Sequence, residues 1–546
     1  MPRSRLLAPA LAAPLWGLCA LLSGAAHAQQ VKLPPPTTEE ETGPRPAPTS
    51  ANKPDAGPAS ANNPDAATAI PKDAAAAGAL RASERTAFGA SGSPPTAADT
   101  GSGLSFGSYG RAGIGSDLRG NGGYGVNVVS FGSRLEKPSY LELNFYYGGT
   151  IGDDPAQRWR AVVVPAFAGE LFHYSGNFTT QNFGLRNAYA ETENLFTKGL
   201  RLWAGSRMYR GDDVYLFDFW PLDNLNTVGG GVGYRFNHDR TDFAWQVGMN
   251  RLSNIFQFQE IPVPARNLPP DSVLLSPQAA TGTALQLDRP RVVTSFKLTH
   301  FLRDLQKTPN AKVVLYAELH YLPAGQRQTA TPGTLEQTLL QLPQDFGWVA
   351  GAQLGGWLRP FVFANVFLRA AGGLAAYGDL GQPFGFDNNL QVTKSRDITA
   401  AFSLNWESQA LGVMGGGYVH SFRDASSGDN RGFDEGALAV RPQVYLSRYF
   451  HLAGELSYQL RSPVTVDQNR GAYLHPQVFR ASVMPVVAPL GRGTYSRPAI
   501  YAVYTLSLLN GDAQYTLWNP GDIRAGHTDV HYLGLGAEWW FNSSYR

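Results

Sequence analysis

The chain has 546 residues, of which 43% are hydrophobic, 12% aromatic and only 16% charged, with a formal net charge of +2 and one cysteine. The small net charge gives no reason to expect a nucleic-acid partner. A mean hydropathy of −0.22 excludes a bundle of membrane-spanning helices. The composition therefore describes a chain that is aromatic-rich and charge-poor but still polar on average.

The first 28 residues have the pattern of a secretory signal peptide. Two arginines open the chain, Leu6–Leu22 is an apolar stretch, and Ala26-His27-Ala28 has the small-residue spacing of a cleavage site. We therefore expect residues 1–28 to be removed on secretion. The only cysteine, Cys19, lies inside this segment. The mature protein is then expected to have no disulfide, no thiol catalyst and no cysteine-based metal site.

Residues 29–103 form a segment of different composition, rich in proline and alanine. Residues 31–100 contain 12 Pro, 18 Ala and a single aromatic residue, Phe88. Ser50–Ala59 and Ser60–Ala69 are a tandem repeat of ten residues. Such a composition buries too little apolar surface to offset chain entropy, so we expect a disordered periplasmic arm. It is either an inert spacer or an arm that reaches a periplasmic partner or the cell wall.

From Leu104 onward, short segments alternate between apolar and polar residues. In Ser139–Gly148 the apolar side chains fall on one face and the polar ones on the other. Ala311–Leu322 and Tyr532–Phe541 repeat the pattern. Alternation with period 2 predicts β-strands that have one apolar and one polar face.

Two all-β architectures suit many such strands: a soluble sandwich or propeller, and a transmembrane barrel with an apolar exterior. Strand faces that end in aromatic residues favour the barrel. So do connections of unequal length, exemplified by the short Arg119–Gly123 and the long Arg423–Phe433. In lipid every strand edge must be paired, so the sheet must close. The length available between Leu104 and Phe541 predicts roughly 16–20 antiparallel strands around an aqueous lumen.

Five segments within this region resemble the maltoporin-type (LamB-like) carbohydrate porin family. Their order along the chain is that of the family, whereas residues 235–480 match it poorly. The segments are Phe106–Gly115, Arg134–Gly148, Leu202–Asp223, Tyr495–Tyr504 and Leu533–Phe541.

The resemblance implies an 18-stranded outer-membrane barrel over residues 104–546, a homotrimer, and facilitated diffusion of maltooligosaccharides or other oligosaccharides. It implies neither enzymatic activity nor a cofactor or metal; the expected partners are the passing sugars and membrane lipid. The family's channel has an aromatic slide for the apolar faces of sugar rings and a charged track for their hydroxyls. Both ideas are physically sound, because aromatic rings suit apolar faces and ionised groups make strong hydrogen bonds.

Position by position, the resemblance places twelve residues at the sugar path. The aromatic slide is expected at Tyr109, Tyr140, Tyr495 and Trp540, with Phe178 inserted from a neighbouring subunit. The charged track is expected at Arg111, Arg134, Glu142, Arg186 and Asp218. A further family arginine falls at Gly211, so its neighbour Arg210 is expected to replace it. Trp220 stands where a tyrosine more commonly narrows the pore.

Three other functions remain open at this stage. One is an outer-membrane barrel enzyme, a lipase or protease with a serine and a histidine brought together by the fold. Another is a porin without sugar selectivity, and a third is a structural barrel with a plugged lumen. The sequence contains no G-x-S-x-G, P-loop or H-E-x-x-H motif. His527 and His531 are four residues apart, but they run into a predicted strand, and we expect no metal site there.

Overall fold

The computed structural model describes most of the chain beyond the arm. The described residues are 102–119, 122–123, 125–137, 139–169, 183–250, 258–264, 281–287, 289–303, 310–330, 337–359, 361–378, 387–426, 431–519 and 521–543. The expected signal peptide, almost all of the arm, and Phe178 lie outside them.

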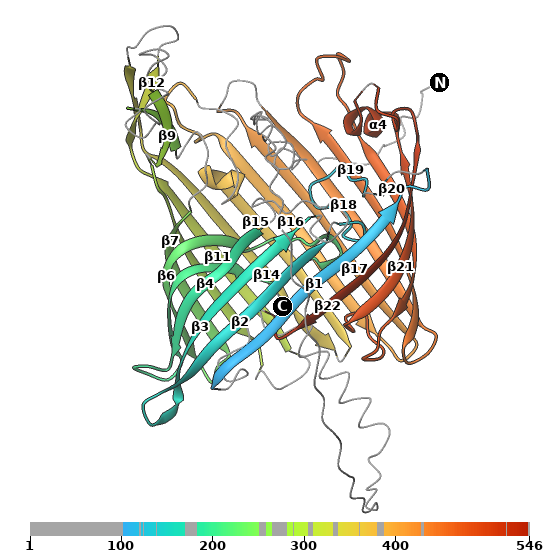
Figure 1. The fold of residues 1–546 in the computed structure, drawn as a ribbon, viewed down its shortest axis with the longest axis horizontal. Coiled ribbons are helices and arrows are strands. Elements are labelled where there is room, and N and C mark those ends of the chain that lie inside the picture. Colours follow the sequence, from blue (N-terminus) through green and yellow to red (C-terminus); the bar gives the residue numbers. More distant parts are fainter. Residues whose placement is uncertain are drawn as a thin grey trace, which may run out of the picture.

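Eighteen strands form one closed antiparallel sheet, as the resemblance implies (Figure 1). They are β1 Gly103–Ser116, β2 Tyr140–Ile151, β3 Asp154–Ala168, β4 Phe183–Glu193, β5 Leu200–Arg210, β6 Asn224–Phe236, β7 Thr241–Asn250, β10 Arg291–Phe301, β11 Asn310–Leu322, β14 Asp345–Arg359, β15 Val362–Gly373, β16 Ser395–Glu407, β17 Leu411–Asp424, β18 Arg431–Tyr445, β19 Phe450–Pro463, β20 Gln477–Val487, β21 Ala499–Leu509 and β22 Asp529–Phe541.

The barrel closes where the first strand pairs with the last. Each strand pairs with the next barrel strand in the chain, and β1 also pairs with β22, which places Tyr109 opposite Trp540. Closure leaves no unpaired edge, which is the requirement for a sheet in lipid. The first and last strands therefore become neighbours, so that Tyr109 and Glu538 lie side by side although they are 429 positions apart in the chain.

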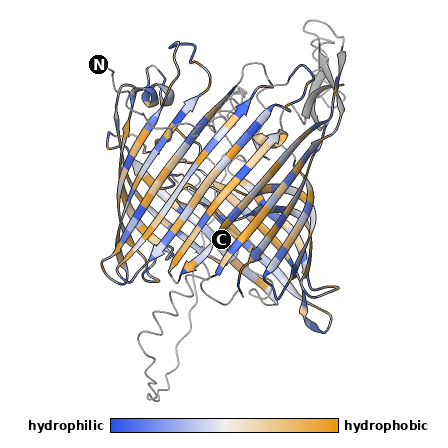
Figure 2. Ribbon diagram, turned by 180° about the vertical axis from the view of Figure 1, so that it is seen from behind, coloured by the Kyte–Doolittle hydropathy of each residue, from blue (hydrophilic) through white to orange (hydrophobic). Residues whose placement is uncertain are grey.

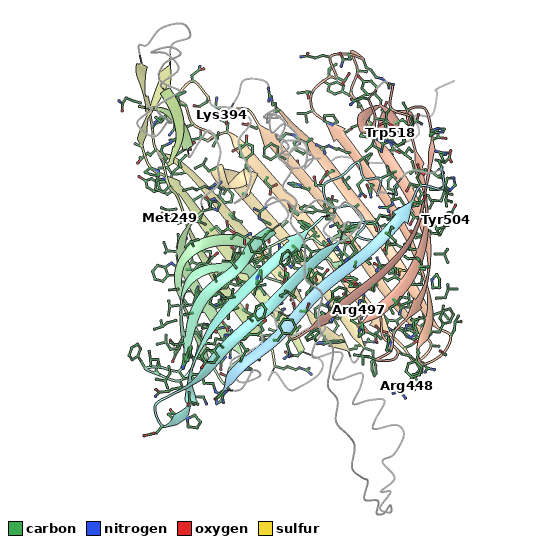
Figure 3. The ribbon with its side chains drawn as sticks, in the orientation of Figure 1. Met249, Lys394, Arg448, Arg497, Tyr504 and Trp518 are labelled. Carbon is green, nitrogen blue, oxygen red and sulfur yellow. The ribbon has the colours of Figure 1, made fainter. Side chains whose placement is uncertain are left out.

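The connections differ between the two ends of the barrel. At the short-turn end, which Arg448 marks in Figure 3, several turns have only two to four residues, such as 152–153 and 446–449. At the long-loop end, marked by Lys394, lie longer connections. These carry two small hairpins, β8 Phe258–Pro264 with β9 Thr281–Leu287 and β12 Gly325–Ala330 with β13 Gln337–Leu342, and the helices η6 Leu374–Tyr377 and α4 Gly511–Leu517. None of the helices in the described residues is long and apolar enough to cross a membrane.

Two expected connections have different bounds in the structure. Arg119–Gly123 does not join two strands by itself. It lies near the start of a 23-residue connection, 117–139, between β1 and β2. Its glycines mimic a tight turn, but the chain continues inward before β2 begins. The expected Arg423–Phe433 connection is shortened to 425–430, because β17 and β18 stay paired as far as Asp424 and Arg431.

The predicted alternation is confirmed on β2. Phe145 and Tyr147 are 40% and 55% exposed on the outer surface, whereas the inward Asn144 and Tyr146 are 0% and 1% exposed. Hydrophobic and hydrophilic residues alternate along many strands of the wall in Figure 2. The outer face is thus suited to lipid and the inner face carries most of the polar groups.

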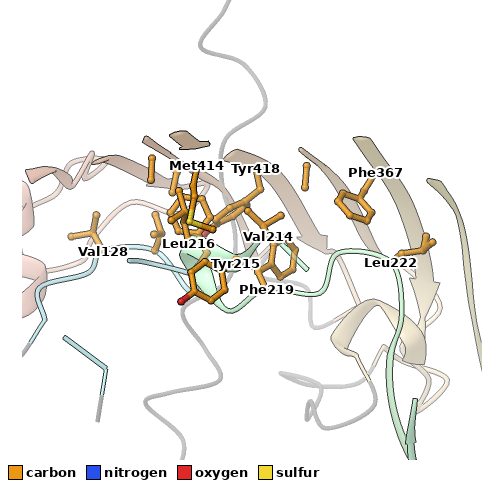
Figure 4. Packing of buried hydrophobic residues seen from close by; sticks show 14 of the residues in the cluster. Val128, Val214, Tyr215, Leu216, Phe219, Leu222, Phe367, Met414 and Tyr418 are labelled. Carbon is orange, nitrogen blue, oxygen red and sulfur yellow. The ribbon is translucent and has the colours of Figure 1, made fainter. Parts of the chain in front are cut away.

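The lumen nevertheless contains a hydrophobic core. The inward faces of β11 and β14–β18 carry apolar side chains at one level, including Val314, Phe367, Met414 and Tyr418. Chain from two connections, 117–139 and 211–223, packs on them (Figure 4). The apolar inward residues are therefore covered by protein, not by lipid.

Candidate functional site

Residues 211–223, which we call the constriction loop, fold into the lumen between β5 and β6. The loop contains the short helix η3, Tyr215–Phe217, and Asp218 ends that helix in the left-handed conformation, at a φ of 51°. Asp tolerates this conformation better than most residues do. Leu216 and Phe217 are buried in the lumen core, where Phe217 packs edge-on against Tyr418 of β17. Apolar burial thus fixes the loop against the wall formed by β11–β18.

A second piece of chain, residues 125–137, crosses the lumen beside the constriction loop; we call it the inner segment. The backbone N–H of Arg134 donates to Leu216 O at 3.1 Å. The Lys137 ammonium donates to Phe217 O at 3.0 Å. Further along, the Phe131 ring stacks on Phe219 with 4.0 Å between centroids. The two pieces therefore narrow the lumen as one packed unit.

The inner segment is also bound to the part of the wall that β19 and β20 form. The N–H of Val128 donates to Gln459 Oε1 at 3.1 Å, and the Ser133 hydroxyl donates to Glu455 at 2.5 Å. Glu136 pairs with Arg480 of β20. These bonds fasten the segment that joins β1 and β2 to strands β19 and β20.

Asp218 is the anionic centre of the constriction loop. Its carboxylate accepts from Arg111 at 2.6 Å and Lys137 at 3.3 Å, and Arg134 Nε lies 3.5 Å away. Burial alone would raise the pKa of Asp218, but Arg134, Lys137 and Arg111 outweigh it and hold that pKa well below its usual value. Burial lowers the pKa of Lys137, and the nearby Arg111 and Arg134 lower it further, although Asp218 opposes the shift. Asp218 therefore stays ionised and fastens β1 and the inner segment to the loop.

Glu538 on β22 is a second anionic centre, on the opposite side of Arg134. Its carboxylate accepts from Arg134 at 2.6 Å, from Arg497 at 2.8 Å and from the Tyr215 hydroxyl at 2.7 Å. Arg497 comes from the turn 488–498 and lies low in the barrel in Figure 3. Arg134 thus links the two carboxylates, and Tyr215 joins the constriction loop to β22.

Four of the five expected slide residues lie side by side on the barrel wall. Ring centroids are 5.8 Å apart for Tyr140 and Tyr109, 6.4 Å for Tyr109 and Trp540, and 6.4 Å for Trp540 and Tyr495. Tyr215 flanks this row, 5.1 Å from Tyr495. The fifth, Phe178, lies outside the described residues. Strands β1, β2 and β22 and the 488–498 turn thus bring four aromatic side chains into one row.

The row is covered by guanidinium groups. Tyr109 is 0% exposed and Trp540 only 9%. Arg497 lies over the Trp540 ring at 4.5 Å and Arg111 over Tyr140 at 5.6 Å, both within cation–π distance. A sugar ring could stack on Trp540 only after Arg497 moves.

The remaining expected charged-track residues divide into two groups. Arg186 on β4 pairs with Glu142 and donates to the Tyr140 hydroxyl, so both flank the aromatic row. Arg210 lies apart from them, with its guanidinium 3.9 Å from the Trp220 ring and its Nε bonded to Asn224 at 2.7 Å.

Gly211 shows why an arginine is absent at its position. A Cβ placed there would overlap the carboxylate of Asp223. Asp223 in turn accepts from Lys297 of β10 at 2.6 Å. A side chain at 211 would therefore require Asp223 to move.

Four residues of the constriction were not among the expected site residues: Lys137, Tyr215, Arg497 and Glu538. All lie inside or next to the segments that carry the family resemblance, and Glu538 shares the lumen face of β22 with Trp540. Strand alternation could therefore have identified Glu538. Loop residues carry no such pattern, so Tyr215 and Arg497 could not be found in that way.

Comparison with known proteins identifies the family. A family model described as LamB porin matches residues 104–541, about four-fifths of the chain. The chain belongs to the LamB porin family. Porins are outer-membrane channels, so this porin is a transmembrane β-barrel channel of the outer membrane.

Solved structures are similar to the chain only at low sequence identity and low TM-score. The outer membrane channel DcaP of Acinetobacter baumannii has 9% identity and a TM-score of 0.43, with 80% of this chain and 98% of that chain covered. OccAB4 of Acinetobacter baumannii has 11% identity and a TM-score of 0.38, with 80% and 97% covered. OpdK of Pseudomonas aeruginosa, solved with vanillate, has 12% identity and a TM-score of 0.36, with 80% and 97% covered. No curated protein matches the chain.

Within the described part of the chain, no three His, Cys, Asp or Glu side chains are placed to hold a metal ion together. His531 pairs with Asp529 at 3.0 Å and shares a hydrogen bond with the Tyr504 hydroxyl. The backbone N–H of His527 donates to Arg524 O at 3.1 Å. The two histidines therefore take part in local hydrogen bonding.

Proposed function

We propose that this porin mediates facilitated diffusion of oligosaccharides along the row Tyr140, Tyr109, Trp540 and Tyr495. The observation that carries the proposal is the juxtaposition of this row with ionised groups at the constriction. Aromatic rings suit the apolar faces of a pyranose, while Arg111, Glu142 and their neighbours suit its hydroxyl rim. Several weak sites in a row let a ligand both enter and leave.

In this proposal a sugar passes the constriction in two steps. Its ring first replaces Arg497 on Trp540, and one of its hydroxyls then accepts a hydrogen bond from the displaced guanidinium. The cation–π contact of Arg497 on Trp540 is worth about 0.5–2 kcal/mol, so a sugar ring can replace it at modest cost. The displaced guanidinium can keep its bond to Glu538 while it donates to a sugar hydroxyl. The arginines would then act as both covers and ligands.

Planar-bilayer conductance with titration of maltooligosaccharides tests the proposal. We expect Tyr140→Ala and Trp540→Ala to raise the half-blocking sugar concentration by about tenfold each, since a buried aromatic contact is worth roughly 1–2 kcal/mol. Tyr147→Ala and Trp539→Ala are matched controls, because these residues lie on the outer face of the same strands. They should leave sugar block unchanged.

Three results would contradict the proposal. If sugar block is the same in all four variants, the aromatic row is not the sugar path. If no sugar blocks the wild-type current while ions pass freely, the protein is a porin without sugar selectivity. A conductance near zero would instead indicate a plugged structural barrel.

We further propose that the mature protein begins after residue 28, that residues 29–103 form a periplasmic arm, and that the barrel is a homotrimer. The proposals rest on the cleavage pattern, the composition of the arm and family membership. Native mass spectrometry of detergent-extracted protein tests both the start site and the number of subunits. A monomer mass, or a retained leader, would refute the corresponding proposal.

A further inference from the structure

Four arginines surround one small cavity beside the constriction. Arg111, Arg134, Arg441 and Arg497, which we call the arginine cluster, line it together with Glu538. The cavity measures about 30 Å³, room for one or two water-sized groups. The strands β1, β18 and β22, the inner segment and the 488–498 turn all contribute to it.

The ring of Tyr215 lies within the arginine cluster. The guanidinium carbons of Arg134, Arg441 and Arg497 lie 4.0, 5.9 and 5.9 Å from its centroid. An electron-rich ring face attracts cations. This ring helps three like charges to gather where they would otherwise repel one another.

The cluster carries more positive than negative charge. Arg441 is balanced by Glu455 at 2.6 Å. The other cations are Arg111, Arg134, Arg497 and Lys137, and the carboxylates that face them are Asp218 and Glu538. Five cations thus meet three carboxylates, which leaves two positive charges uncompensated within this set.

One donor of the arginine cluster has no acceptor. Arg134 is 95% buried, and its Nη1 makes no hydrogen bond within the described part of the chain. A buried donor on a charged group is costly to leave unsatisfied. The Nε and Nη2 of Arg134 already face Asp218, Tyr109 and Glu538, so Nη1 is the part of the guanidinium that is left to donate to a further acceptor. The site therefore has the geometry and the charge to accept one anionic group.

We propose that the arginine cluster binds the carboxylate of an acidic sugar, so that this channel favours uronate-containing oligosaccharides over neutral ones. The inference rests on the proposed sugar transport, whose substrate class it specifies. The sugar rings would lie along the aromatic row while the carboxylate approaches through Arg111 and Lys137. These two are the more exposed cations, at 16% and 27% of their side-chain surface.

The test compares two probes of equal length, trigalacturonate and its full methyl ester, in which methyl groups remove the charges of the carboxylates. The purified porin is placed in planar bilayers at about 0.1 M KCl, where screening is limited. We expect trigalacturonate to block at a concentration about tenfold lower than the ester, equivalent to one charge-assisted contact of roughly 1.4 kcal/mol.

Three variants locate the preference. Arg111→Gln and Lys137→Gln should each reduce the ratio of the two half-blocking concentrations severalfold, and Arg111→Lys should retain most of it. Arg235→Gln is the matched control, because Arg235 lies in the lumen at the short-turn end, paired with Glu193 and Asp242. It should leave the ratio unchanged.

The outcomes separate this inference from the function on which it rests. If both probes block equally well, the inference is overturned while sugar transport stands. If neither probe nor any neutral maltooligosaccharide blocks, sugar transport fails and the inference with it. If trigalacturonate is preferred but Arg111→Gln and Lys137→Gln keep the full ratio, the assignment to the arginine cluster is wrong.

Discussion

Asp218 allows a direct test of what holds the constriction loop in the lumen. Asp218→Asn keeps the size of the side chain but removes the charge that faces Arg111, Lys137 and Arg134. Three cations would then remain close together with only Glu538 nearby. The hydrophobic face of the loop, including Phe217, is untouched.

The burial of Asp218 and its partners sets how strongly Asp218→Asn should weaken docking of the constriction loop. Asp218 is 8% exposed, and its partners Arg134 and Arg111 are 4% and 16% exposed. Removing one member of a buried ionic group costs about 3–5 kcal/mol. At 1.4 kcal/mol per factor of ten, docking of the loop should weaken by a factor between about 10² and about 4 × 10³.

Single-channel recording is the appropriate assay. We expect Asp218→Asn to give a larger and noisier open-channel current, because the loop leaves the wall part of the time. Asp529→Asn is the control, since its pair with Arg119 is about 40% exposed and such pairs contribute only about 0–1 kcal/mol. Unchanged current and noise in Asp218→Asn would refute the assignment of Asp218 as an anchor.

The pH dependence of the wild type provides an independent check. The pKa of Asp218 is lowered in the folded protein, so its contribution is fully present above the usual Asp pKa of about 4. It is lost as the pH falls through the lowered value. The wild-type current should therefore be the same at about pH 7 and pH 5, and should approach that of Asp218→Asn only below the usual Asp pKa.

Two further substitutions probe other contacts of the lumen. Gly416→Val should also enlarge the current, because the added Cβ would lie 2.6 Å from Val214 Cγ1 of the constriction loop and such overpacking costs about 1–3 kcal/mol. Gly415→Val is the control and should enlarge the current far less, because the nearest atom to its Cβ is 3.7 Å away. Arg207→Gln should lower the unfolding temperature of the detergent-solubilised barrel markedly, since Arg207 is buried between three aromatic rings and a carboxylate and its loss costs about 3–5 kcal/mol. A shift no larger than that of the exposed Arg423→Gln would contradict this reasoning.

The tertiary structure changes the meaning of one sequence pattern. On β11, Val314 and Tyr316 lie on the face that alternation predicts to be inward. In an open channel that face would meet water, and apolar residues there would be unfavourable. In the folded barrel they are part of the core that receives the constriction loop. Apolar residues on an otherwise polar inward face thus mark the place where a loop docks.

Alternation along the strands predicted the barrel and its facing, because period 2 is a local property that lipid and water enforce on every strand. The matched motifs, not the alternation, indicated the four residues that the fold brings into the aromatic row. The meeting of Arg134 with Glu538, 404 positions apart, and of both with Tyr215 and Arg497, was decided only by closure of the sheet and entry of two connections into the lumen. Those contacts depend on long-range packing. No periodicity in the chain encodes which loop side chain will face which strand.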